Sequence, residues 1–167
     1  MPAGSAVPAR LLPGRLLTEP RTVLFVCVGN AGRSLMAEAI FNADPPAGWR
    51  AESAGTEPAG APDPKTGPLL REIGLDLPPH PPQRLTDAAL DRAPLRITMG
   101  CLDRPSCPAR LRGGGTRDWG LADPHDLDLE GARGIRDEIR RRIAALRTEL
   151  AARPDPPAPG RPSGDRE

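Results

Sequence analysis

The apolar residues of this chain follow two different periods. Residues 22–28 form a short, continuous apolar run with β-branched members, which is typical of a strand buried on both faces of a parallel sheet. Residues 49–55 and 95–100 are interpreted as two further strands. Residues 130–150 instead carry a stripe of apolar side chains opposite charged ones, which predicts a long amphipathic helix. That stripe consists of Ile135, Ile139, Ile143, Leu146 and Leu150.

Three shorter stretches are also predicted to be helical. Residues 34–43 combine strong helix formers with apolar positions at helical spacing, and Ser34 stands where the helix begins. Residues 68–74 end at a glycine that suits a helix C-terminus. Residues 86–93 form a short helix with Thr86 as its N-cap. Each predicted helix follows a predicted strand or a connecting loop.

Proline and glycine mark the connections and the ends of the chain. The four prolines of residues 75–85 require an extended connection, and residues 101–116 are predicted to form a loop. Residues 1–20 and 151–167 are rich in proline and poor in apolar side chains, so we expect two disordered tails. The sequence therefore predicts one folded domain over residues 21–150.

Strands that alternate with helices predict an α/β fold with a parallel sheet. Ligands of such sheets bind outside the carboxyl ends of the strands. Cys27 and Cys101 both fall at or just beyond the carboxyl end of a predicted strand. We therefore expect two cysteines that are far apart in the sequence to lie at the same edge of the sheet.

Charge and composition exclude several classes of function. The formal net charge is +1 and aromatic residues make up 2% of the chain, which disfavours nucleic-acid binding. No apolar run has the roughly 20 residues of a membrane span, and no secretion signal is evident. We therefore expect a soluble, cytoplasmic monomer without nucleic-acid or membrane partners. Positive charge is almost entirely arginine, with Lys65 the only lysine, a bias that we attribute more to codon composition than to function.

The cysteines favour thiol chemistry over a structural role. Their number is three, which does not suit a disulfide framework. A zinc site would need four ligands, and the two histidines are poorly placed to complete one. Two inert loop thiols remain an alternative for Cys101 and Cys107.

The bend after residues 22–28 carries the strongest candidate chemistry. Between Cys27 and Arg33 lie Val28, Gly29, Asn30, Ala31 and Gly32. Such a junction between a strand and a helix directs backbone N–H groups at one point and binds anions. Arg33 adds a fork that matches a tetrahedral oxyanion, and the same positive surroundings favour the thiolate form of Cys27. Ser34 could donate a hydrogen bond to that thiolate. The bend predicts a nucleophilic sulfur aimed at a bound oxyanion.

A lone cysteine at the end of a strand is more often a small buried hydrophobe. The two glycines, the arginine at this spacing and the following helix together favour the catalytic interpretation.

Several motifs in order resemble the low-molecular-weight protein tyrosine phosphatase superfamily. They are "FVCVGNAGRS", "MAEA", "ESAGT", "REIGLDL", His80, "ITMGC", "CP", "DWGLADP" and "RDEIRRRI", which cover roughly residues 22–148. The resemblance implies a four-stranded parallel sheet flanked by helices on both faces. It also implies that Cys27 is the nucleophile, Arg33 stabilises the transition state and Asp123 is the general acid.

Within this superfamily the chain is most similar to the thioredoxin-coupled arsenate reductases. Members of that branch carry a pattern similar to "TMGC…CP…WG-x-x-DP". The matching stretch of this chain is "TMGCLDRPSCPARLRGGGTRDWGLADP". The resemblance implies that Cys27 attacks arsenate, that Cys101 then attacks Cys27 and releases arsenite, and that Cys107 forms a disulfide with Cys101. Thioredoxin or a low-molecular-weight thiol such as mycothiol would reduce that disulfide. The extra cysteine pair favours thioredoxin, and we expect no resident cofactor.

The chain departs from the pattern of its relatives in four ways. Five residues separate Cys101 from Cys107 where better-studied reductases have six, so Cys107 is placed with more certainty than Cys101. Some members bind potassium through an aspartate together with the equivalents of Asn30, Glu38 and Ser53. In this chain Gln83 stands near the position of that aspartate, which argues against a potassium site.

The other two departures concern the loop and the acid. Gly32 replaces a second loop cysteine, and the acid is followed by "DPHD" in place of "DPYY" in a chain without tyrosine. This tells against a typical tyrosine phosphatase. A low-molecular-weight phosphatase that forms a phosphocysteine on Cys27 stays an alternative, as does an oxyanion-binding regulatory protein. His80 is expected to order its loop through hydrogen bonds.

Overall fold

Four parallel strands pair side by side in the order β2-β1-β3-β4. They are β1 (Arg21–Cys27), β2 (Trp49–Gly55), β3 (Leu95–Thr98) and β4 (Thr116–Asp118). The structure is a computed structural model and describes residues 20–153. The α/β fold with a four-stranded parallel sheet is confirmed. The central position of β1 places Cys27, its last residue, at the middle of the carboxyl edge.

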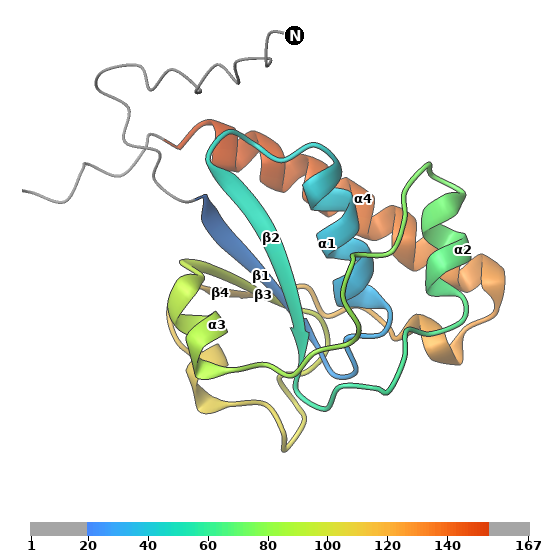
Figure 1. Ribbon diagram of the computed structural model, residues 1–167. Helices are drawn as coiled ribbons and strands as arrows, with labels where there is room; N and C mark the ends of the chain where they lie inside the picture. Colours follow the sequence, from blue (N-terminus) through green and yellow to red (C-terminus); the bar gives the residue numbers. More distant parts are fainter. Residues whose placement is uncertain (1–19, 154–167) are drawn as a thin grey trace, which may run out of the picture.

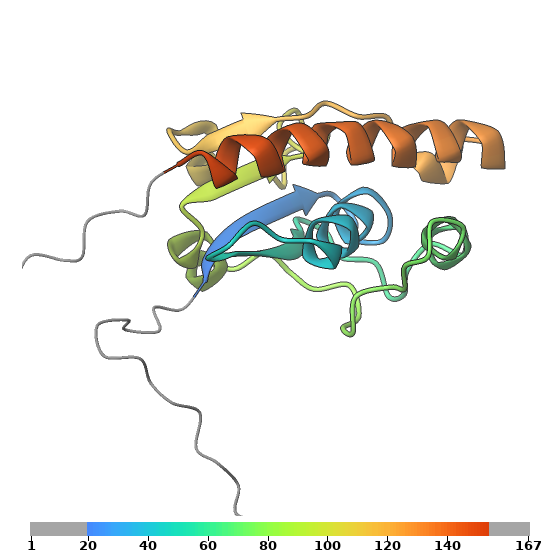
Figure 2. The ribbon, with the colours of Figure 1, turned by 90° about the horizontal axis from the view of Figure 1, so that it is seen from above.

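Within residues 20–153, four α-helices and two short 3₁₀ helices connect and cover the strands. The α-helices are α1 (Arg33–Ala43), α2 (Thr66–Arg71), α3 (Asp87–Arg92) and α4 (Leu129–Ala151). The 3₁₀ helices are Ala109–Arg112 and Pro124–Asp126. Figure 1 shows α1 and α4 together on one side of the sheet and α3 on the other. Figure 2 shows α4 lying along the direction of the strands.

Alternation along β1 divides the core between the two faces of the sheet. Phe25 points toward the side of α1 and α4, where it packs with Phe41 and with the apolar stripe of α4. Leu24 and Val26 point to the opposite side, toward α3 and the segment that holds Cys101. Because β1 is buried on both faces, it gives the loop after Cys27 a fixed base.

Helix ends agree with the sequence patterns with one exception. Thr86 caps α3, where its Oγ1 accepts a hydrogen bond from the Ala89 N–H at 3.1 Å. Gly74, with a φ of +79°, ends the turn after α2. The prediction that Ser34 begins α1 is wrong. The N-cap is Gly32 without a side-chain cap, and Ser34 lies in the first turn with its hydroxyl turned toward Cys27.

The sequence pattern missed the fourth strand. β4 has three residues, its neighbours are glycines and charged side chains, and its apolar content is too low to show a strand period. The predicted loop 101–116 contains the Ala109–Arg112 turn and ends at β4.

The predicted tails lie almost wholly outside the described residues, and α4 extends one residue past the expected boundary, to Ala151. None of the helices between residues 20 and 153 is long and apolar enough to cross a membrane.

Candidate active site

Residues 27–34, which we call the oxyanion loop, connect the end of β1 to the first turn of α1. The Cys27 Sγ accepts a hydrogen bond from the Asn30 N–H at 3.2 Å and lies 2.9 Å from the Ser34 Oγ. Cys27 is 2% exposed and lines a pocket at the carboxyl edge of the sheet. Donors therefore surround a sulfur that keeps one open approach, as a nucleophile requires.

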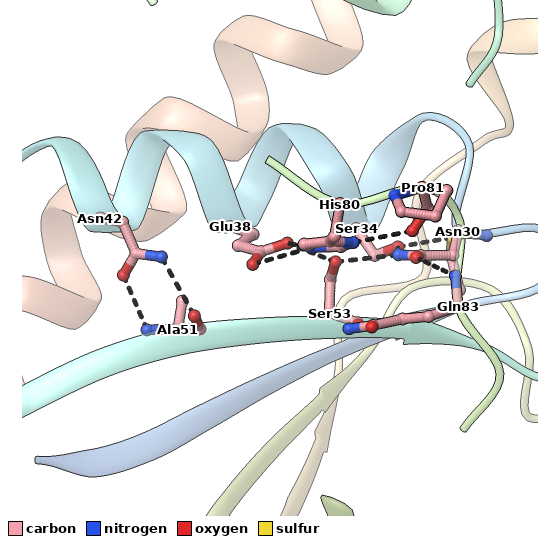
Figure 3. Close-up of polar contacts among 10 residues, drawn as sticks. Asn30, Ser34, Glu38, Asn42, Ala51, Ser53, His80, Pro81 and Gln83 are labelled. Atoms are coloured by element: carbon pink, nitrogen blue, oxygen red, sulfur yellow. Dashed lines mark hydrogen bonds and ion pairs between the residues drawn. The ribbon is translucent and has the colours of Figure 1, made fainter. Parts of the chain in front are cut away.

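The buried Asn30 holds the loop in its shape. Its φ of +49° is the left-handed conformation that asparagine tolerates better than most residues. The side-chain amide donates to the Ser34 Oγ at 2.8 Å and to the Ser53 Oγ at 2.9 Å. Its Oδ1 accepts from the Gln83 N–H at 2.9 Å. Figure 3 shows these three partners converging on Asn30 from α1, β2 and the proline-rich connection.

Beyond Ser53 the network continues to a buried carboxylate. Ser53 donates to the Glu38 Oε2 at 2.6 Å, and the His80 Nε2 lies 2.8 Å from the same oxygen (Figure 3). Burial raises the pKa of Glu38 above its ordinary value, against the opposing effect of these hydrogen bonds. Burial would lower the pKa of His80, but the Pro81 carbonyl and the Glu38 carboxylate raise it. His80 thus orders its loop through hydrogen bonds, as predicted.

Two glycines allow the backbone to approach the loop closely. A Cβ on Gly55 would lie 2.6 Å from the Val28 O and 2.9 Å from the Asn30 N. Gly100 has a φ of +88°, and a Cβ there would collide with the Arg33 guanidinium. Neither position can hold a side chain without displacing the loop or its arginine.

Arg33 joins the oxyanion loop to the segment that holds the predicted acid. The guanidinium is 6% exposed, and its Nη1 donates to the Leu121 O at 3.0 Å. Its Nη2 lies 3.4 Å from the Asp123 Oδ2. The half-exposed Asp123 accepts a further hydrogen bond from the His125 N–H at 2.9 Å. The Cys27 thiol, the Arg33 guanidinium and the Asp123 carboxyl group thus line one pocket at the sheet edge.

The pocket over Cys27 has a volume of about 370 Å³. The oxyanion loop forms its floor, and small apolar residues of the segment after β2 form one wall. Polar side chains at its mouth are Asp63, Arg104, Asp123 and His125. Among the residues that the structure describes, no Phe, Tyr or Trp side chain lines this pocket.

Cys101 and Cys107 lie together on the other face of β1. Both are buried in the core with Leu24 and Val26, and their sulfur atoms are 4.0 Å apart. Burial, with the neighbouring thiol of Cys107, raises the pKa of Cys101 to about 12. Both side chains are therefore enclosed by the core, and the raised pKa of Cys101 favours its protonated form.

Sequence reasoning missed two residues beside the site. Asp63 lies 2.5 Å, measured from its Oδ2, from the His125 Nδ1, and the Lys65 Nζ donates to three backbone carbonyls around His125. Their signal was available, since Lys65 is the only lysine of the chain. The local sequence does not indicate which backbone carbonyls a side chain will contact 60 residues away.

Within residues 20–153, no group of three or more His, Cys, Asp and Glu side chains could hold a metal ion. The Glu38 carboxylate is engaged by Ser53 and His80, and the absence of a potassium site stays a prediction.

Comparisons with known proteins agree with this geometry. The family model described as low molecular weight phosphotyrosine protein phosphatase matches residues 22–155. The chain belongs to this family. Its sequence is 30% identical over 137 residues to arsenate reductase 1 of Staphylococcus haemolyticus, covering 79% of this chain and 98% of that protein.

Solved structures of the family include both reductases and phosphatases. The thioredoxin-dependent arsenate reductase of Corynebacterium glutamicum is 31% identical with a TM-score of 0.66, covering 81% of this chain and 64% of that one. An arsenate reductase of Archaeoglobus fulgidus is 35% identical with a TM-score of 0.65, covering 75% and 98%. An arginine phosphatase of Geobacillus stearothermophilus is 28% identical with a TM-score of 0.67, covering 78% and 93%. The family thus shares one fold between two chemistries.

Proposed function

We propose that this protein is an arsenate reductase that uses Cys27, Cys101 and Cys107 in sequence. The observation that carries the proposal is the pair of thiols 4.0 Å apart beside the oxyanion loop, since hydrolysis of a phosphate ester needs no second thiol. Curated relatives named as arsenate reductases support the same choice. Oxyanion binding is common to both chemistries of the family.

In the first step the Cys27 thiolate attacks the arsenic of arsenate held by the oxyanion loop and Arg33. An S–As bond forms, and one arsenate oxygen leaves as water with a proton from Asp123. Arg33 and the loop N–H groups stabilise the negative charge of the transition state. Asn30 and Ser34 hold the sulfur in its place during the attack.

In the second step the Cys101 sulfur attacks the Cys27 sulfur. An S–S bond forms, the S–As bond breaks and its electron pair passes to arsenic, and the proton of the Cys101 thiol passes to an oxygen on arsenic as arsenite leaves. Cys107 then attacks Cys101 and releases Cys27, so the protein ends with a Cys101–Cys107 disulfide. The sulfur atoms of that pair must approach by about 2 Å to reach the length of a disulfide bond. A thioredoxin-like dithiol reduces the disulfide and completes the cycle.

The test compares two reactions in matched variants. We expect Cys101→Ser and Cys107→Ser each to abolish thioredoxin-coupled arsenate turnover and to leave aryl-phosphate hydrolysis within about threefold, because only the reductase needs these thiols. Cys27→Ser should abolish both reactions and serves as the control. Undiminished arsenate turnover in both loop variants would contradict the relay.

A phosphatase activity is the second candidate. The pocket extends from the oxyanion loop along Ala59, Ala61 and Pro62, which leaves room for an organic group beyond the oxyanion. The same assay decides between the two, since a phosphatase would hydrolyse aryl phosphates as wild type, Cys101→Ser and Cys107→Ser, but none of these proteins would show thioredoxin-coupled arsenate turnover.

A further inference from the structure

Lys65 is bonded to the segment that carries the predicted acid. Its ammonium donates to the carbonyls of Pro124, His125 and Leu127 at 3.2, 3.0 and 2.8 Å. These carbonyls follow Asp123 directly in the chain. The ammonium thus binds the backbone carbonyls of the turn at residues 124–127, and its position restricts where that turn can lie.

The same part of the chain is bonded to the oxyanion loop. Residues 59–66, which we call the strap, leave β2 and lead to α2 (Figure 1). The Asp63 N–H and the Thr66 hydroxyl both donate to the Ala31 O, at 3.0 and 2.7 Å. The Ala59 N–H donates to the Gly29 O at 2.9 Å. The strap therefore connects the loop of the nucleophile to the turn after the acid.

A second contact pairs the same two segments. The Asp63 Oδ2 lies 2.5 Å from the His125 Nδ1, and its Oδ1 accepts the Lys65 N–H at 2.9 Å. Burial would raise the pKa of Asp63, but the hydrogen bonds from Lys65 and His125 lower it. Asp63 is therefore a carboxylate at neutral pH, and it orients both Lys65 and His125.

A lysine suits this position better than the arginine used elsewhere in the chain. An ammonium has three donors around one nitrogen and can address three converging carbonyls at once. A guanidinium holds its donors in a flat fork, which matches carboxylates and oxyanions instead. The one lysine of the chain stands where three carbonyl oxygens meet.

We propose that Lys65 is a positioning residue for the general acid: through the carbonyls of residues 124–127 it holds Asp123 at its working distance from Cys27. Lys65 itself does not contact the substrate in this proposal. The proposal rests on the proposed function only in that Asp123 acts as the acid. It makes the strap, and not only the oxyanion loop, part of the catalytic geometry.

The test uses two aryl phosphates whose leaving groups differ in their need for a proton. Phenyl phosphate releases a phenolate with a conjugate acid pKa of about 10, whereas 2,4-dinitrophenyl phosphate releases a much weaker base. The parameter kcat/KM reports the transfer of the phosphoryl group to Cys27, in which the acid acts. General acid catalysis contributes about 100-fold or more to such steps.

We expect Asp123→Asn to lower kcat/KM for phenyl phosphate about 100-fold and to leave that for dinitrophenyl phosphate within about threefold. Lys65→Met should show the same selective pattern with a loss of about tenfold. Lys65→Arg, which keeps the charge without the three-way geometry, should fall between Lys65→Met and the wild type. In the Asp123→Asn background Lys65→Met should have no further effect, because both changes remove one function.

The outcomes separate this proposal from the proposed function. An equal loss with both substrates in Lys65→Met, or a loss that multiplies with that of Asp123→Asn, would show a merely structural role and overturn the proposal. A silent Asp123→Asn variant would instead refute the acid assignment itself and the positioning role with it. Arg110→Met is the matched control, since it removes an exposed cation that pairs with Asp87 and Asp91 and does not line the pocket.

Hydrogen exchange provides a measurement that needs no turnover. The N–H groups of His125, Asp126 and Leu127 are hydrogen-bonded within the turn. In Lys65→Met we expect their amides to exchange at least about tenfold faster, because the turn loses three tertiary hydrogen bonds. Unchanged protection in that variant would overturn the proposal.

Discussion

The oxyanion loop and the segment of Cys101 and Cys107 lie on the same edge of the sheet, but they are built in opposite ways. In the loop, Asn30, Ser34 and Ser53 hold the Cys27 sulfur among donors with one open side. In the second segment, the two thiols are enclosed in the core and the pKa of Cys101 is raised by burial. The sulfur of the first opens into the pocket, whereas the two sulfurs of the second are enclosed by the core.

This difference indicates how a reductase can avoid oxidation of its thiols in the absence of substrate. A paired, exposed dithiol would oxidise in the absence of substrate. In the proposed relay, a buried pair reacts only after the first adduct has formed and the segment has shifted. The order of the proposed steps would then follow from packing as well as from chemistry.

The largest expected effect comes from breaking the loop at Arg33. Arg33→Lys keeps the charge but loses the fork, and the shorter reach forfeits the bond to the Leu121 carbonyl. We expect kcat for arsenate reduction and for aryl-phosphate hydrolysis to fall together, by about 100- to 1000-fold. Steady-state kinetics of both reactions checks this. A loss confined to one reaction would contradict the shared first step.

The effect of intermediate size is a difference in the rate of alkylation between Cys27 and the pair Cys101 and Cys107. We expect iodoacetate to label Cys27 on the order of tenfold faster than Cys101 or Cys107, because only Cys27 opens into the pocket. Arsenate or phosphate should suppress labelling of Cys27 alone. Peptide mapping by mass spectrometry gives the rate at each position. Equal rates at all three would refute the contrast between an open and a protected site.

The smallest effect concerns the support of the loop by His80. Because its folded-state pKa is raised, its contribution to stability is complete below its unfolded value of about 6.5 and is lost as pH rises through the folded pKa. We expect His80→Gln to lower the free energy of unfolding by about 1 kcal/mol at pH 5.5 and by less at pH 9. Urea unfolding of both proteins at each pH measures the difference. His125 is present in both proteins, so its contribution cancels in the difference between their free energies of unfolding. A difference that grew with pH would contradict the stabilising role of the protonated His80.

The sequence predicted the parts of the molecule that depend on local pattern. The apolar run of β1 and the stripe of α4 specify their elements, since burial of a whole strand or a helix face leaves a periodic record. The loop from Cys27 to Arg33 could also be interpreted in sequence, because the glycines, the cysteine and the arginine stand within seven residues. β4 left no such record in its three residues.

Only the tertiary structure could show the contacts between segments that are far apart in the chain. The environment of Cys101 and Cys107 depends on Leu24 and Val26, so the sequence of their own loop, rich in proline and glycine, could not show that both thiols are buried. Lys65 was visible as the only lysine, but its three acceptors are backbone carbonyls, which every residue has. Side-chain chemistry can be predicted from residue types, whereas the enclosure of a thiol and the partner of an ammonium are set by the fold that brings distant backbone together.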